Sequence, residues 1–394
     1  MASFPSQLPR SPSLLPKVSL LLLSLFSCGG LFDADDSASP RYAAIFSFGD
    51  SLADTGNFLL SGALPFPSIS RLPYGVTYFG RPTGRCSDGR LVVDFIAEAF
   101  GLPLLPPYLA QGQSFQQGVN FAFAGATALD TAFFEERGIS DILWSNSSLS
   151  VQLAWFEKLK PSLCGTPGEC NAFFNRSLFL VGEIGGNDYN YAFFKGKGLV
   201  EVRSYVPMVV QAIANATEKL IRLGATELMV PGNLPVGCST LYLTLYGTPD
   251  KKDYDRRNGC LKQLNVFAKY HNALLQRALG KLRRRYQAAR IIYADYYGAA
   301  IRFAHAPRHF GFVNGALRAC CGGGGPYNFN VSAACGHPGS TVCSDPSSYV
   351  AWDGIHLTES AHRDIATGLL EGPYTTPPLL PSTTGIPTHS SGLF

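Results

Sequence analysis

The segment Ala43-Ala-Ile-Phe-Ser-Phe-Gly-Asp-Ser51 passes from a short apolar stretch directly into a glycine, an aspartate and a serine. Its almost continuous apolar character is typical of a strand that is buried on both faces of a parallel sheet. Three later segments have the same character, Leu178–Ile184, Glu227–Val230 and Ile291–Tyr293. Together the four segments predict the inner strands of one parallel sheet.

Amphipathic helical patterns lie between these strands. One stripe consists of Val206, Val209, Val210, Ile213, Thr217, Leu220 and Ile221, and Gly224 follows where a C-cap is expected. A second stripe consists of Leu261, Leu264, Phe267, His271, Leu274, Leu275, Ala278 and Leu282. We expect His271 to be a packed, hydrogen-bonded residue rather than a catalyst. The alternation of strands and helices predicts a doubly wound α/β domain, in which the site lies beyond the carboxyl ends of the strands.

Ser51 follows the first predicted strand, and we expect it to begin the next helix. At that place the hydroxyl is held at the edge of the sheet, and the backbone N–H points toward a bound anion. The sequence around it is not the Gly-x-Ser-x-Gly turn of α/β-hydrolases. Taken alone, a helix N-cap serine is the simpler interpretation.

The segment Trp352-Asp-Gly-Ile-His356 supplies what a nucleophilic serine needs. A serine hydroxyl is a poor nucleophile until a base removes its proton, and imidazole does this well near neutral pH. Asp353 can fold back through a turn to bind the Nδ1–H of His356, and Thr358 can cap a following helix. Activity should then rise as the pH passes through ~6.5. Alone, this pattern also fits a surface turn.

Two glycine-containing segments follow predicted strands and can supply donors for an oxyanion. Gly125 comes after the apolar run that begins at Gly118, where a residue without Cβ lets the backbone approach an anion. Asn187 lies in Gly185-Gly-Asn-Asp188, directly after the strongest strand candidate. The alternatives are a tight turn for Gly125 and an Asx-turn for Asn187.

In this order, the four blocks resemble the GDSL esterase/lipase family, also called SGNH hydrolases, in its plant branch. The resemblance extends over about residues 43–370 and includes the segment Cys320-Cys-Gly-Gly-Gly-Gly. It implies a flavodoxin-like α/β/α sandwich with a mostly parallel, doubly wound sheet. It also implies a carboxylic ester hydrolase that forms an acyl-enzyme and needs no cofactor or metal.

The same resemblance assigns roles to individual residues. Ser51 is expected to be the nucleophile, His356 its base and Asp353 the partner of that base. Gly125, Asn187 and the Ser51 N–H are expected to form the oxyanion hole. A transacylase would use the same residues, and a binding protein that has lost turnover is the further alternative.

The N-terminal residues predict a secretory signal peptide over residues 1–30. Arg10 and Lys17 precede the apolar run Val18–Phe26, which is shorter than the ~20 residues that a membrane span needs. Four sequons, at Asn146, Asn175, Asn215 and Asn330, predict N-glycosylation. We therefore expect a secreted protein, in the extracellular space, the cell wall or a vacuole, without a stable membrane span.

The cysteines suit an oxidising compartment. Nine remain after the leader: Cys86, Cys164, Cys170, Cys238, Cys260, Cys320, Cys321, Cys335 and Cys343. Eight can form four disulfides, and Cys86 is the candidate free thiol because the others cluster in pairs. Zinc is the disfavoured alternative, since no Cys-x-x-Cys or His-paired spacing is present.

Composition limits the partners. With 46% hydrophobic and 15% charged residues, the chain can bury a large core, and its net charge of +4 is small. The basic run Arg283–Arg285 is a solvated helix end, so we expect no nucleic-acid partner. The substrate is expected to be a small-molecule, lipid or sugar ester, with the loop Leu72–Arg85 as a possible part of its pocket.

One hydrolase domain is expected over residues 41–373, followed by a disordered tail, 374–394, rich in Pro, Thr and Ser. The oligomeric state stays open.

Overall fold

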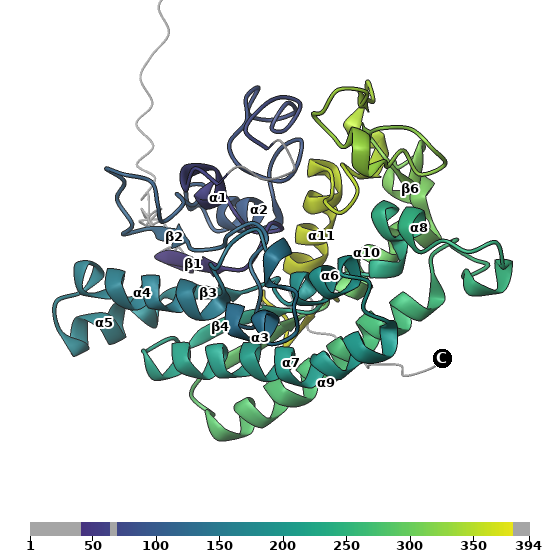
Figure 1. The fold of residues 1–394 in the computed structure, drawn as a ribbon. Coiled ribbons are helices and arrows are strands. Elements are labelled where there is room, and N and C mark those ends of the chain that lie inside the picture. Colours follow the sequence, from purple (N-terminus) through teal and green to yellow (C-terminus); the bar gives the residue numbers. More distant parts are fainter. Residues whose placement is uncertain (1–40, 64–68, 381–394) are drawn as a thin grey trace, which may run out of the picture. The chain divides into compact units, whose positions relative to one another are not determined.

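A computed structural model describes residues 41–63 and 69–380 of the chain (Figure 1). The predicted signal peptide lies outside the described residues. The strands are β1 Ala44–Phe48, β2 Gly118–Asn120, β3 Ser177–Val181, β4 Glu227–Pro231, β5 Arg290–Ala294, β6 Gly315–Ala319, β7 Cys321–Gly322, β8 Thr341–Val342, β9 Tyr349–Ala351 and β10 Thr375–Thr376. The helices are α1 Asn57–Leu60, α2 Val92–Ala99, α3 Thr131–Glu135, α4 Leu149–Leu163, α5 Pro167–Phe174, α6 Gly186–Phe194, α7 Leu199–Arg222, α8 Thr240–Leu245, α9 Lys262–Arg285, α10 Tyr296–His305 and α11 Glu359–Glu371.

The main sheet of the described residues has the strand order β10-β5-β4-β3-β1-β2. The pairs β1–β2, β1–β3, β3–β4 and β4–β5 are parallel, and β10 pairs antiparallel with β5. The parallel strands thus follow the 2-1-3-4-5 order of flavodoxin-like folds, whose ligands bind where the order reverses between β1 and β3. The four predicted strands and the doubly wound sheet are confirmed, and β2 adds a short fifth parallel strand.

Helices cover both faces of this sheet, which explains why its inner strands are apolar at almost every position. Along β1, Ala44, Phe46 and Phe48 belong to the core that includes residues of α4, α5, α7 and α9. Ile45, between them, belongs to the core that includes α2, α10 and α11. Because side chains alternate along a strand, each face needs its own apolar set.

Aromatic rings hold β1 in the centre of the sheet. The Phe46 ring lies 5.0 Å from that of Phe179 on β3 and 5.5 Å from that of Phe156 on α4. The Phe48 ring stacks 5.1 Å from that of Phe121, which follows β2. Such pairs add about 0.5–1.5 kcal/mol each beyond the area they bury. The strand that leads to Ser51 is therefore packed from both of its neighbours.

The two predicted long helices are present as α7 and α9. Gly224 follows the C-cap of α7 with a φ of 113°, a conformation that favours glycine. His271 on α9 is fully buried, and its Nδ1 lies 2.7 Å from the hydroxyl of Tyr189. Burial lowers the pKa of His271 to about 3, so it stays neutral. It is a packed, hydrogen-bonded residue, as expected.

Eight of the described cysteines form disulfides. The pairs are Cys164–Cys170, Cys238–Cys260, Cys320–Cys343 and Cys321–Cys335. Cys86 is buried and, among the described residues, is the free cysteine. The predicted pattern of four bridges and one free Cys86 is confirmed. Within the described ranges, no helix is long and apolar enough to span a membrane.

The chain after residue 373 departs from the expected disordered tail. Thr375 and Thr376 form β10 and pair with Ala294 and Tyr293 at the edge of the main sheet. Leu379 is fully buried, and its N–H donates to Thr375 Oγ1 over 3.0 Å. A two-residue edge strand is too short to produce an apolar pattern, so the Pro- and Thr-rich composition gave no sign of this segment. The prediction is wrong for residues 374–380, and residues 381–394 lie outside the described range.

Leu379→Ala tests whether this last segment belongs to the core. Removing a fully buried leucine side chain leaves a cavity, so we expect the free energy of unfolding to fall by about 2–5 kcal/mol. Val200→Ala is the control, because that side chain is 87% exposed and such changes usually stay within about 0.5 kcal/mol. Urea unfolding followed by tryptophan fluorescence measures both. Equal losses in the two variants would contradict a core role for Leu379.

Candidate active site

Ser51 lies just beyond the carboxyl end of β1, in a turn over residues 51–53, and its residue is only 6% exposed. The expectation that a helix begins at Ser51 is wrong, because α1 begins at Asn57. The Asp54 carboxylate accepts the N–H groups of Gly56 and Asn57, each over 2.7 Å, and that of Phe58 over 3.0 Å. These bonds fix the helix start six residues later and leave Ser51 on a separate tight turn.

Gly49, two residues before Ser51, is held on both of its backbone polar groups. Gln152 on α4 accepts from the Gly49 N–H over 2.9 Å and donates to its carbonyl over 2.8 Å. The N–H of Asp50 donates to the Glu183 carbonyl beyond β3, over 3.1 Å. A Cβ at Gly49 would lie 2.8 Å from that same carbonyl oxygen. The backbone at Gly49 is therefore packed so closely that only glycine fits at this position.

The predicted nucleophile, base and acid form one continuous chain of hydrogen bonds. Ser51 Oγ lies 2.9 Å from Nε2 of His356, and Nδ1 of His356 lies 2.8 Å from Oδ2 of Asp353. The other carboxylate oxygen of Asp353 accepts the N–H groups of Ile355 and His356, each over 2.8 Å. The expected turn is therefore present, and Thr358 caps α11 as expected.

The groups around Asp353 in this series of hydrogen bonds favour its charged form. Burial alone would raise the pKa of Asp353, but the His356 ring and the backbone donors hold it below its ordinary value. Burial works to lower the pKa of His356, yet the adjacent Asp353 carboxylate outweighs it, and the pKa is raised well above its ordinary value. Burial raises the pKa of the nearby Cys86 thiol, which also contacts His356.

Tyr74 is a further member of this group that the sequence did not single out. Its hydroxyl donates to Asp353 Oδ2 over 2.8 Å, the oxygen that also faces His356. The ring is fully buried and lies edge-on to Trp352. Tyr74 comes from the loop Leu72–Arg85, which was expected only as a possible pocket wall.

Gly125 lies in the loop after β2 with a φ of 81°, so its backbone favours glycine. A Cβ there would lie 2.8 Å from the hydroxyl of Tyr191 and 2.9 Å from Cβ of Trp144. Tyr191 also donates its hydroxyl to the Gly125 carbonyl over 2.9 Å. The tight turn that was the alternative for Gly125 is present, and Tyr191 and Trp144 fill the space that a Cβ would take. The approach of the Gly125 backbone to an anion stays a prediction.

Asn187 lies in the first turn of α6 and connects the Gly125 loop to the Ser51 turn. Its Nδ2 donates to the carbonyl of Ala126 over 3.1 Å and to Oδ2 of Asp50 over 3.2 Å. Its Oδ1 accepts from Nδ2 of Asn190 over 3.1 Å. The structure therefore brings Asn187 beside both the Ser51 turn and the loop of Gly125.

Two buried carboxyls lie behind Ser51. Burial raises the pKa of Asp50 to about 6 and that of Glu183 well above its ordinary value, and the two groups share a hydrogen bond. Glu183 therefore keeps its proton at neutral pH and donates a hydrogen bond to Asp50, whose carboxylate keeps its charge. Asp50 remains the acceptor that Asn187 needs.

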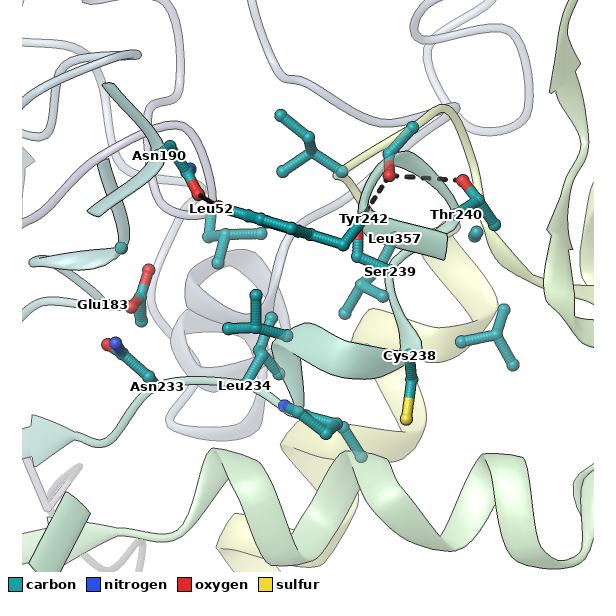
Figure 2. Close-up of a pocket in the computed structure, with 18 of the residues that line it drawn as sticks. Leu52, Glu183, Asn190, Asn233, Leu234, Cys238, Ser239, Thr240, Tyr242 and Leu357 are labelled. Atoms are coloured by element: carbon teal, nitrogen blue, oxygen red, sulfur yellow. Dashed lines mark hydrogen bonds between the residues drawn. The ribbon is translucent and has the colours of Figure 1, made fainter. Parts of the chain in front are cut away.

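A mostly apolar pocket opens beside Ser51 and Asn187 (Figure 2). Its empty volume is about 920 Å³, including the mouth. Apolar walls include Leu52, Leu234, Val236, Phe303, Ile355 and Leu357. In the figure, Glu183 and Asn233 lie on one side and the Tyr242 ring crosses toward Asn190. The described lining contains no lysine, arginine or histidine.

A smaller hollow of about 310 Å³ is lined by His356, Asp353, Tyr74, Trp144 and Phe329. Gly125 lines neither hollow in the described part of the chain. Within the same ranges, no group of three or more histidine, cysteine or acidic side chains has a metal-binding arrangement. Ser51 thus lines the larger pocket, and His356 lines the smaller hollow.

Sequence reasoning missed Gln152, Asp54, Asn190 and Tyr74. Only Asp54 carried a local signal, because it follows the Gly-Asp-Ser block by three residues and precedes a helix. The four sequon asparagines, Asn146, Asn175, Asn215 and Asn330, are all exposed. Their glycosylation stays a prediction.

Known proteins resemble the chain over most of its length. A family model described as GDSL-like Lipase/Acylhydrolase matches residues 45–369. A GDSL esterase/lipase of Arabidopsis thaliana is 54% identical over 343 residues, which are 86% of this chain and 92% of that relative. The sinapine esterase of Brassica napus is 50% identical over 348 residues, 87% of this chain and 89% of that relative. The chain therefore belongs to the GDSL esterase/lipase family and is an enzyme that acts on carboxylic ester bonds.

Proposed function

We propose that the chain is a secreted serine esterase that works through an acyl-enzyme, with Ser51 as nucleophile, His356 as base and Asp353 as the partner of that base. The observation that carries this proposal is the hydrogen-bond chain from Ser51 Oγ through both ring nitrogens of His356 to Asp353, with steps of 2.9 Å and 2.8 Å. It meets the geometric requirement for a nucleophile, its base and a third group that orients the base.

In the first half-reaction, Ser51 Oγ attacks the ester carbonyl while His356 Nε2 takes its proton. The imidazolium that forms is stabilised by Asp353, whose carboxylate keeps its charge because three N–H donors and Tyr74 surround it. His356 then gives the proton to the leaving alcohol. In the second half-reaction, the same imidazole activates a water that releases the acid.

The oxyanion of each tetrahedral intermediate needs donors, which we assign to the N–H groups of Ser51 and Gly125 and the side-chain amide of Asn187. In the free enzyme both hydrogens of Asn187 Nδ2 are engaged, the one toward Asp50 over the longer distance of 3.2 Å. We assign that N–H to the oxyanion, which replaces Asp50 as acceptor. Donors of this kind are held ready before charge develops.

The pocket indicates the acyl or aryl part of the substrate. Its apolar walls favour a hydrocarbon or aromatic group. The charge of Asp50, with no basic side chain in the described lining, disfavours an anionic group. Sinapine, which names the Brassica napus relative, is one ester to include in a substrate panel. The disulfides support secretion, because such bonds persist in oxidising compartments.

Ser51→Ala tests the nucleophile. We expect hydrolysis of p-nitrophenyl esters of increasing acyl length to vanish in the variant, because no other hydroxyl replaces Ser51 beside His356. The purified wild-type protein measured in parallel gives the chain-length preference. Activity that survives in Ser51→Ala would contradict the proposal, and acyl transfer to an added alcohol in preference to water would make the enzyme a transacylase.

Asn187→Ala tests the oxyanion donor. Loss of one such donor costs about 2.7–4 kcal/mol of barrier, so we expect kcat to fall by about 10²–10³. Single-substrate kinetics on the ester that the wild type prefers measures the change. A kcat near that of the wild type would remove Asn187 from the oxyanion hole.

The pH profile tests His356. Only neutral imidazole takes the serine proton, so kcat/KM should rise with pH through the His356 pKa. Because Asp353 raises that pKa, the midpoint should lie above the ~6.5 expected for an unperturbed histidine. Rates from pH 5 to 9 are compared after subtraction of Ser51→Ala rates. A profile that is flat, or that rises below pH 6, would contradict this role.

A further inference from the structure

The side chain of Tyr242 connects α8 to the asparagines of α6 (Figure 2). Its hydroxyl donates to Oδ1 of Asn190 over 2.6 Å, and Nδ2 of Asn190 donates to Oδ1 of Asn187 over 3.1 Å. Asn187 and Asn190 are three positions apart on α6, so their side chains are neighbours on the helix surface. A polar relay thus runs along the pocket wall from Tyr242 to Asn187.

The two ends of the Asn187 amide have different kinds of partner. The amide nitrogen of Asn187 faces Asp50 Oδ2 and the Ala126 carbonyl, whereas its oxygen faces the donor Asn190. A primary amide has one donor end and one acceptor end. Donor on one side and acceptors on the other therefore select a single orientation, with the N–H groups on the side of the Ser51 turn.

Tyr242 fixes the orientation of the Asn190 amide in the same way. It is 3% exposed, and burial raises its pKa well above the ordinary value, so the O–H stays protonated and acts as a donor. A donor beside Asn190 fixes its oxygen toward Tyr242 and its nitrogen toward Asn187. The orientation of one amide thereby sets that of the next.

Helix α8 is also fixed to the turn that carries the base. The Leu241 N–H and the Ser239 hydroxyl each donate to the Gly354 carbonyl over 2.8 Å, and the Thr240 hydroxyl donates to the Asp353 carbonyl over 3.1 Å. The same short helix thus contacts the Asp353–His356 turn through its backbone and first residues, and Asn187 through Tyr242. It ties the position of the base to that of the oxyanion donor.

We propose that Tyr242 and Asn190 are positioning residues of the ester hydrolysis, which act by holding the Asn187 amide with its N–H groups toward the oxyanion. The inference rests on the proposed roles of Ser51 and Asn187. It predicts losses in kcat, because a donor to the oxyanion acts in the transition state.

Asn190→Asp is the sharpest test, because it keeps the shape and the acceptor for Tyr242. The new carboxylate presents an oxygen to Oδ1 of Asn187 where a donor stood, so the two acceptors repel. We expect kcat to fall roughly tenfold or more, with the thermal unfolding midpoint showing that the variant is folded. A folded Asn190→Asp variant with wild-type kcat would overturn the proposal.

Tyr242→Phe removes only the first donor, and we expect a roughly threefold to tenfold fall in kcat. Tyr246→Phe is the matched control. Tyr246 follows α8, and its hydroxyl also donates to α6, over 2.8 Å, but to the backbone carbonyl of Phe193 rather than to an asparagine side chain. We expect Tyr246→Phe to keep the wild-type kcat. Equal losses in both variants would mean that α8 acts only by packing.

Double variants with Asn187→Ala separate positioning from general damage. If Tyr242 and Asn190 act through Asn187, adding Tyr242→Phe or Asn190→Asp to Asn187→Ala should change kcat less than twofold. Full, multiplicative losses in that background would refute the proposal. Failure of the esterase mechanism itself is distinguishable, since it appears as wild-type activity that Ser51→Ala leaves unchanged.

Discussion

The hydrogen bond between Ser51 Oγ and His356 Nε2 joins residues 305 positions apart, and most of the fold can be understood as the means of closing it. One partner leaves the centre of the main sheet, where aromatic rings pack β1 against β3 and α4. The other lies on a turn outside that sheet, between β9 and α11. A bond of 2.9 Å leaves little tolerance, so both supports must be stiff.

Two kinds of signal predicted the site: local patterns such as the Asp353–His356 turn, and motif blocks such as those of Ser51, Gly125 and Asn187, whose order resembles the family. Asp353 and His356 are three residues apart, and the turn between them is a local structure. The inner strands were predictable because burial on both faces demands an almost continuous apolar run. Gln152, Tyr74 and Asn190 were not, since a single glutamine, tyrosine or asparagine is common on any helix or loop. Gln152 contacts Gly49 across 103 positions and Tyr74 contacts Asp353 across 279, and only the folded chain shows such pairs. Leu379 was missed for the related reason that its burial depends on a two-residue edge strand.

Polar groups near Ser51 show how the fold reconciles burial with charge. Asp353 remains ionised because it is surrounded by donors, whereas Glu183 is kept neutral and becomes a donor itself. Burial raises the pKa of Asp50 less than that of Glu183, and Asp50 accepts hydrogen bonds from the Leu52 N–H and the Asn187 side chain. Each buried carboxyl thus has a protonation state that its neighbours set, and the pocket stays apolar beyond this wall.

The adjacent residues Cys320 and Cys321 brace the segment that leads from β9 to Asp353. Their N–H groups donate to the carbonyls of Ala351 and Trp352, over 2.9 Å and 2.7 Å, and their sulfurs are bridged to Cys343 and Cys335. Removal of a native disulfide typically costs about 2–5 kcal/mol, and here that cost would fall on the segment directly before Asp353. A chain made in a reducing cytosol lacks both disulfides, so formation of the Asp353–His356 turn is coupled to oxidative folding. Recombinant production accordingly calls for a host compartment that forms disulfides.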